Sequence, residues 1–151
     1  MEVFDLTRPK KGSARSQPRR IFTLDHANRT LPLVSRIVAD MVRQYKKVCA
    51  LEDRCHIRRP SVSNEEHSSV RRAYEVELDK LRDLSEELSA VGCELKDWRR
   101  GLVDFHAVLN GKKVELCWRL GEERIEFWHE VGAGFTSRQP LDAELTAALS
   151  S

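Results

Sequence analysis

The N-terminal half of the chain carries an apolar seam with helical spacing. Thr23 can cap the first turn of a helix, because its hydroxyl can accept a hydrogen bond from a free backbone amide. Beyond it, apolar residues recur at intervals of three or four positions: Leu31, Val34, Val38, Met41, Tyr45 and Val48. We expect this helix to end near Leu51, with Pro32 producing a kink or a break near its start. Residues 52–62, which contain Pro60, are predicted to form a loop.

A second apolar seam predicts a second long helix. Ser63 and Glu66 have the spacing of a capping box, and Gly92 follows the last apolar position as helix-ending glycines do. The apolar face of this helix contains Tyr74, Leu78, Leu81, Leu84, Leu88 and Val91. Two long helices joined by a short loop are typical of an antiparallel helical hairpin.

In the C-terminal half the apolar positions change to a spacing of two, which predicts β-strands. Asn110-Gly111 is a strong signal for a tight hairpin turn, because both residues tolerate a positive φ. This turn would place Phe105 opposite Leu116 and Val103 opposite Trp118.

A further turn around Gly121-Glu122 predicts a third strand. It would place Leu116 opposite Phe127 and Val114 opposite His129. One face of the resulting sheet would contain Val103, Phe105, Ala107, Val114, Leu116, Trp118, Ile125 and Phe127. The other would contain Asp104, His106, Glu115, Cys117, Arg119, Glu126, Trp128 and Glu130.

The apolar face of this sheet needs a cover, and the helical hairpin is the large apolar surface left to supply it. The predicted fold class is therefore α+β, with a long antiparallel helical hairpin packed on a small antiparallel β-meander of three to four strands. Residues 93–95 are the candidate for the fourth strand.

Three regions follow from these patterns and from the charge distribution. Residues 1–20 contain six basic and two acidic residues, lack periodicity, and predict a disordered basic tail. Residues 21–141 form the predicted single domain, and residues 142–151 a short C-terminal tail. The net charge of the whole chain is only +2, which argues against a nucleic-acid partner.

The composition also limits the cellular setting. The chain has no apolar run of the ~20 residues needed to span a bilayer, and its N-terminus lacks the pattern of a secretory signal. Its four cysteines form no C-x-x-C pair. We therefore expect a cytoplasmic protein with reduced thiols and no membrane partner.

His129 is the first candidate for chemistry, because it falls in phase with the predicted apolar face. A buried histidine needs partners for both ring nitrogens. It could be a structural histidine bonded to a carbonyl and a carboxylate, or it could be a metal ligand or a general base. Glu130 would point to the opposite face of a regular strand, so the two could share one ion only where the strand bulges or ends.

The predicted polar face offers further metal donors. Asp104, Cys117 and Glu126 would share one cross-strand row, and His106, Glu115 and Trp128 the next. Oxygen, sulfur and imidazole donors at this spacing could hold zinc or iron. The ordinary alternative is alternating charge on the solvated face of an antiparallel sheet.

Arg138 follows a glycine-rich loop and could bind a carboxylate or phosphate, or fix the loop to Asp104 or Glu130. We expect Asp104, His129, Glu130 and Arg138 to cluster around the loop of residues 131–139, and these four are the ligand-binding candidates. The metal candidates are His129, Glu130, Asp104 and Cys117, with a divalent metal as the candidate cofactor. No catalytic residue is predicted, because common nucleophile and phosphate-binding motifs are absent from the sequence.

Several segments resemble an uncharacterised bacterial family catalogued as domain of unknown function 2203. In the first helix these are FTL (22–24), AN (27–28) and LPLV (31–34). In the C-terminal half they are ELKD (94–97), GLVDF (101–105), LCWRLGE (116–122), WHE (128–130), GF (134–135) and RQPL (138–141). The resemblance covers about residues 21–141 and implies domain limits and important C-terminal motifs. It implies no reaction.

Three functions remain open at this point. The first is a small non-catalytic binding or adaptor module that uses the sheet and residues 128–141 to recognise an unknown protein or small ligand. The second is a metal-binding protein or metal-dependent enzyme with a site around His129, Glu130 and Asp104. The third is a nucleic-acid accessory protein that uses the basic tail, and self-association through the long helices is a further possibility for partners.

Deletion of residues 1–19 should leave the thermal midpoint almost unchanged. The tail contains too few apolar residues to offset the conformational entropy lost on ordering it. Thermal unfolding followed by circular dichroism compares the full chain with the deletion variant. A large drop in the midpoint would show that the tail packs on the domain.

Overall fold

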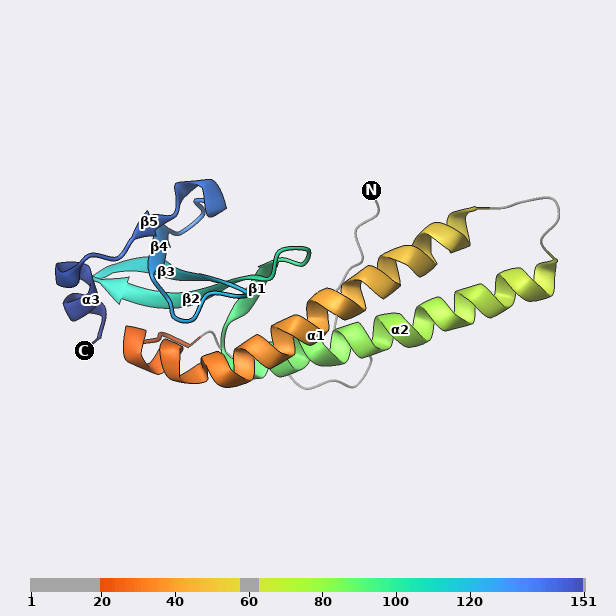
Figure 1. The fold of residues 1–151 in the computed structure, drawn as a ribbon, viewed down its shortest axis with the longest axis horizontal. Coiled ribbons are helices and arrows are strands. Elements are labelled where there is room, and N and C mark those ends of the chain that lie inside the picture. The colour runs from red at the N-terminus through yellow and green to blue at the C-terminus, as the bar shows by residue number, and fades with distance from the viewer. Residues whose placement is uncertain (1–19, 58–62, 151) are drawn as a thin grey trace.

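A long helical hairpin forms one layer of the molecule (Figure 1). The structure, a computed structural model, describes residues 20–57 and 63–150, so the predicted basic tail lies almost wholly outside the described residues. Helix α1 spans Leu24–His56 and helix α2 spans Asn64–Val91. The two helices run antiparallel and side by side, which confirms the predicted hairpin. No helix in the described ranges is long and apolar enough to cross a membrane.

Helix α1 begins where the sequence predicts and ends later. The Thr23 hydroxyl accepts a hydrogen bond from the amide of His26, and the helix continues through Pro32 without a break. The predicted end at Leu51 is wrong, because the helix continues to His56. Residues 52–56 contain neither proline nor glycine, so nothing in the local sequence interrupts the hydrogen-bond ladder.

Helix α2 has both predicted ends. The Ser63 hydroxyl accepts a hydrogen bond from the amide of Glu66, which confirms the N-terminal cap. Gly92 adopts a left-handed conformation with φ of 107°, and its amide donates to the carbonyl of Ser89. The chain then turns directly into the sheet.

The sheet is an antiparallel meander of five strands in sequence order. The strands are β1 (Glu94–Asp97), β2 (Leu102–Leu109), β3 (Lys112–Arg119), β4 (Phe127–Glu130) and β5 (Gln139–Pro140). The predicted fold class is confirmed, with the two-residue strand β5 added beside β4. A short 3-10 helix, η1 (Phe135–Ser137), lies in the loop before β5.

The first β-hairpin has the predicted register. Asn110 and Gly111 have φ values of 51° and 78°, and Phe105 pairs with Leu116. These positive values are what a tight turn between twisted strands requires.

The register predicted for the second β-hairpin is wrong by one residue. Trp128 pairs with Leu116, and His129 pairs with Glu115. The predicted register paired Leu116 with Phe127 and His129 with Val114. Because side chains alternate along a strand, this shift moves His129 and Phe127 to the other face of the sheet.

The loop before β4 explains the shift. Ile125 does not enter the sheet, because its amide donates to the Asn28 side chain of α1. The Arg119 amide and the Trp118 indole donate to the side chain and the carbonyl of Glu122, respectively. These contacts make a wider loop than the tight two-residue turn that the prediction assumed.

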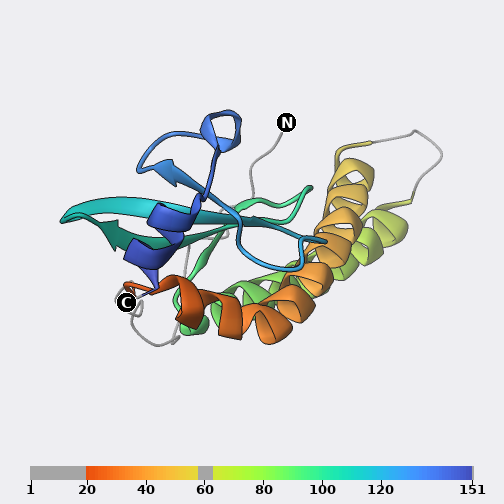
Figure 2. The same cartoon turned by 60° about the vertical axis from the view of Figure 1, so that its left-hand side comes forward.

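The core lies between the sheet and the open end of the helical hairpin, where α1 begins and α2 ends (Figure 2). Phe105 is fully buried, and its ring meets that of Phe22 edge-on at 5.2 Å between centroids. Residues 142–151, assigned to a short tail by the sequence analysis, contain helix α3 (Ala143–Leu149). Leu149 is buried in the same core.

Trp118→Ala should lower the free energy of unfolding by about 3–5 kcal/mol, because Trp118 is 1% exposed and a cavity would remain. Val108→Ala on neighbouring strand β2 is the control. Val108 is 41% exposed, so its truncation should cost less than about 0.5 kcal/mol. Urea denaturation measures both, and equal effects for the two variants would contradict the packing described above.

Candidate metal centre

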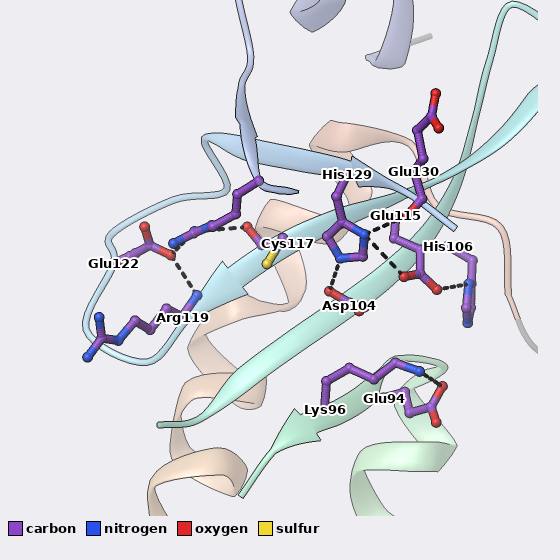
Figure 3. Close-up of polar contacts among 11 residues, drawn as sticks. Glu94, Lys96, Asp104, His106, Glu115, Cys117, Arg119, Glu122, His129 and Glu130 are labelled. Atoms are coloured by element: carbon purple, nitrogen blue, oxygen red, sulfur yellow. Dashed lines mark hydrogen bonds and ion pairs between the residues drawn. The ribbon is translucent and has the colours of Figure 1, made fainter. Parts of the chain in front are cut away.

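The polar side chains that the described part of the chain buries are gathered in one place. Asp104, Glu115 and His129 are 4%, 5% and 2% exposed, respectively. They come from β2, β3 and β4 and lie on the face of the sheet opposite the apolar core (Figure 3). The centre of this face is therefore buried, not solvated as alternating charge would suggest.

His129 is held by both of its ring nitrogens. Nδ1 lies 2.8 Å from the backbone carbonyl oxygen of Glu130, and Nε2 lies 3.0 Å from Oδ1 of Asp104. A carbonyl can only accept, so Nδ1 must carry a proton. Nε2 therefore faces the carboxyl group of Asp104 with either a shared proton or a free lone pair.

The charge state of His129 follows from these contacts. Burial alone would lower its pKa, because the imidazolium loses its hydration. The hydrogen bonds to the Glu130 carbonyl and to Asp104, together with the negative charges of Asp104 and Glu115, outweigh burial and raise the pKa. In the metal-free protein, these contacts favour the imidazolium.

Glu115 links three other members of the cluster. Its Oε2 lies 3.5 Å from Nδ1 of His129, and its Oε1 lies 3.5 Å from Nδ1 of His106. It also lies close enough to Asp104 for the two carboxyl groups to interact electrostatically. Burial raises the pKa of Glu115, and the neighbouring Asp104 carboxyl raises it further.

Cys117 adds a sulfur donor beside Asp104, its cross-strand partner. The thiol is 2% exposed, and its sulfur lies within 4.8 Å of a carboxylate oxygen of Asp104. Burial raises the pKa of Cys117 to about 12, with a further contribution from the charge of Asp104. Without a metal, this thiol is protonated and unreactive at neutral pH.

Asp104, Cys117 and His129 meet the geometric requirement for one metal ion. One ligand atom of each lies within 4.8 Å of the others. Nε2 is the imidazole atom that can serve, because Nδ1 donates to the Glu130 carbonyl. Metal-bound histidines commonly have their second nitrogen fixed in this way.

The remaining predicted site residues lie elsewhere. The Glu130 side chain is exposed and pairs with Lys112 at 2.8 Å, so only its carbonyl reaches His129. Arg138 Nη2 lies 2.6 Å from Glu122 Oε1 and 3.4 Å from the Cys117 carbonyl oxygen. The predicted four-residue cluster is therefore wrong, because only Asp104 and His129 of the four meet through their side chains.

The predicted polar rows also change with the shifted register. Phe127, not Glu126, pairs with Cys117, and the guanidinium of Arg138 stacks 3.9 Å from the Phe127 ring centroid. His129, not Trp128, pairs with Glu115. Trp128 instead packs against the core.

Two partners were missed by the sequence analysis. Glu115 was placed among the possible metal donors of the polar face but not beside His129, because the wrong register put His129 on the other face. Glu122 was considered only as a turn residue, although it pairs with Arg138. A search for buried partners of His129 in each alternative register would have found Glu115.

The fold and the site together define an α+β protein whose antiparallel sheet carries a buried cluster of oxygen, sulfur and imidazole donors. The family model described as "Uncharacterized conserved protein (DUF2203)" matches residues 20–141. The chain belongs to this family, as the motifs in its sequence indicate. No curated protein and no solved structure matches it.

Glu115→Gln should change how stability depends on pH in the metal-free protein. The folded-state pKa of Glu115 lies above the ordinary value of 4.5, so folding strengthens proton binding at this carboxyl. The resulting stabilisation is present below pH 4.5 and is lost as pH rises through the folded-state pKa. Glutamine stays neutral and avoids this loss.

The variant should therefore gain stability relative to the unsubstituted protein as pH rises above 4.5. The thermal midpoints of the variant and the unsubstituted protein, measured across this pH range with a chelator present, test the prediction. Glu123→Gln, which removes an exposed carboxylate from the β3–β4 loop, controls for the loss of one charge. A constant difference between Glu115→Gln and the unsubstituted protein across the range would refute the assignment.

Proposed function

We propose that this protein binds a divalent transition metal, with Zn²⁺ as the first candidate, through Asp104, Cys117 and His129. The observation that supports the proposal is the meeting of a carboxylate, a thiol and an imidazole within 4.8 Å in a buried position. Carboxylate oxygen, thiolate sulfur and imidazole nitrogen are all zinc ligands. Of the three functions considered from the sequence, the second is thus the best supported, with Cys117 in place of Glu130.

The hydrogen bonds of the cluster are compatible with this role. In the metal-free state, Nε2 of His129 lies 3.0 Å from Oδ1 of Asp104, and the Cys117 thiol keeps its proton. A metal ion would displace the protons held by these groups, because zinc binds the thiolate and the neutral imidazole. The Glu130 carbonyl would keep the proton on Nδ1 and so leave the Nε2 lone pair for the metal.

The proposed role is binding, not catalysis. The three ligand residues are 2–4% exposed, so a substrate could not reach the metal without a rearrangement of the sheet. A metal at this site would link β2, β3 and β4. It would so stabilise the part of the sheet from which residues 128–141 extend. This retains the expected binding or adaptor role of that surface for an unknown protein or small ligand.

The proposal includes a cytoplasmic location, because Cys117 must remain a thiol to serve as a ligand. All four cysteines are free in the structure. The nucleic-acid function would depend on the basic tail, which lies outside the described residues apart from Arg20, and no described contact favours it.

Metal analysis of the untagged protein tests the proposal. After incubation with zinc and removal of the excess, the unsubstituted protein should retain about one equivalent per chain. Cys117→Ser and His129→Gln should each weaken zinc binding by at least about tenfold. Cys55→Ser removes a thiol near the C-terminal end of α1, which lies far from the sheet in Figure 1, and should retain the metal.

Circular dichroism of each variant establishes that it remains folded. If all the folded variants retain the same zinc as the unsubstituted protein, the metal is held elsewhere and the proposed site is wrong. If the unsubstituted protein binds no zinc, cobalt or iron, the cluster is a structural hydrogen-bond network instead.

A further inference from the structure

His106 lies at the most exposed edge of the buried cluster. Its side chain is 12% exposed, compared with 7% for Glu115, 5% for Asp104 and 3% for His129. Figure 3 shows His106 on the far side of Glu115 from Cys117. Exposure therefore falls step by step from His106 towards the proposed ligands.

We propose that His106 and Glu115 form the route by which a metal ion reaches the buried site, an inference that rests on the proposed function. Imidazole and carboxylate are themselves metal ligands, so the pair can hold an ion during transfer. Glu115 contacts His106 through Oε1 and His129 through Oε2, and it lies beside Asp104, the next ligand inwards (Figure 3). The ion passes from His106 to Glu115, then to Asp104, and finally to Cys117 and His129.

His106 does not belong to the final ligand set. The group whose ligand atoms lie within 4.8 Å of one another contains Asp104, Cys117 and His129. His106 contacts Glu115 through Nδ1 at 3.5 Å and lies one step further out. Its role is to position the ion on its way to the site.

A residue on the route has a kinetic signature that a ligand does not have. Binding and release pass through the same intermediate, so removing the intermediate slows both rates by the same factor. The equilibrium Kd is the ratio of the two rates and stays unchanged. Removal of a ligand instead raises Kd, mostly through faster release of the ion.

The experiment measures Zn²⁺ uptake and release by the metal-free full-length chain in a stopped-flow instrument. His106→Ala should slow uptake and release on the order of tenfold, with no change in Kd. His106→Asn is measured beside it, because it keeps a hydrogen-bonding side chain if the alanine variant unfolds. His56→Ala, which removes an exposed imidazole at the end of α1, should leave both rates unchanged.

Unchanged rates in both folded His106 variants would overturn the route. A higher Kd with an unchanged association rate would also overturn the route, because this result would make His106 a ligand. If the unsubstituted protein takes up no zinc, the proposed function itself fails, and this outcome is distinct from a failure of the route alone.

Discussion

Two carboxyl groups buried against one another need a positive charge beside them, and this constraint determines the chemistry of the sheet. Asp104 and Glu115 lie close enough for their charges to interact, at 4% and 5% exposure. Burial of one unpaired ionised carboxylate is unfavourable, and a second nearby increases the penalty. The imidazole of His129 lies next to both. It can supply the positive charge itself as an imidazolium or, in our proposal, hold a metal ion that supplies it.

The fold places this cluster through strand pairing alone. Asp104 and Cys117 face each other across β2 and β3, and Glu115 faces His129 across β3 and β4. Regular strands hold these side chains more rigidly than loops would. The helical hairpin contributes indirectly, because it covers the apolar face and so fixes which side of the sheet carries the polar residues.

The sequence predicted those features that have strong local signals. Thr23 and Ser63 marked the two helix starts, and Asn110-Gly111 fixed the first β-hairpin. The second β-hairpin lacked such a signal, and the alternation of apolar residues there favoured a register that the structure does not have. The contact from Asn28 to Ile125 keeps Ile125 out of the sheet, and it joins residues far apart in the chain.

The same limitation explains what was missed in the site. A polar face on an antiparallel sheet has the same sequence pattern whether it is solvated or buried, so the burial of Asp104 and Glu115 could not be derived. His129 was correctly singled out as a residue needing two partners, and it has the carbonyl and carboxylate partners considered for it. Arg138 was placed in the wrong group because its partner, Glu122, lies in the unpredicted loop.

The coordination of the metal is the most direct test of the central claim. X-ray absorption spectroscopy of the zinc-loaded, untagged protein should show one sulfur at about 2.3 Å and nitrogen or oxygen ligands at about 2.0–2.2 Å. The sulfur contribution should disappear in Cys117→Ser. Zinc bound only by nitrogen and oxygen in the unsubstituted protein would contradict the proposed centre.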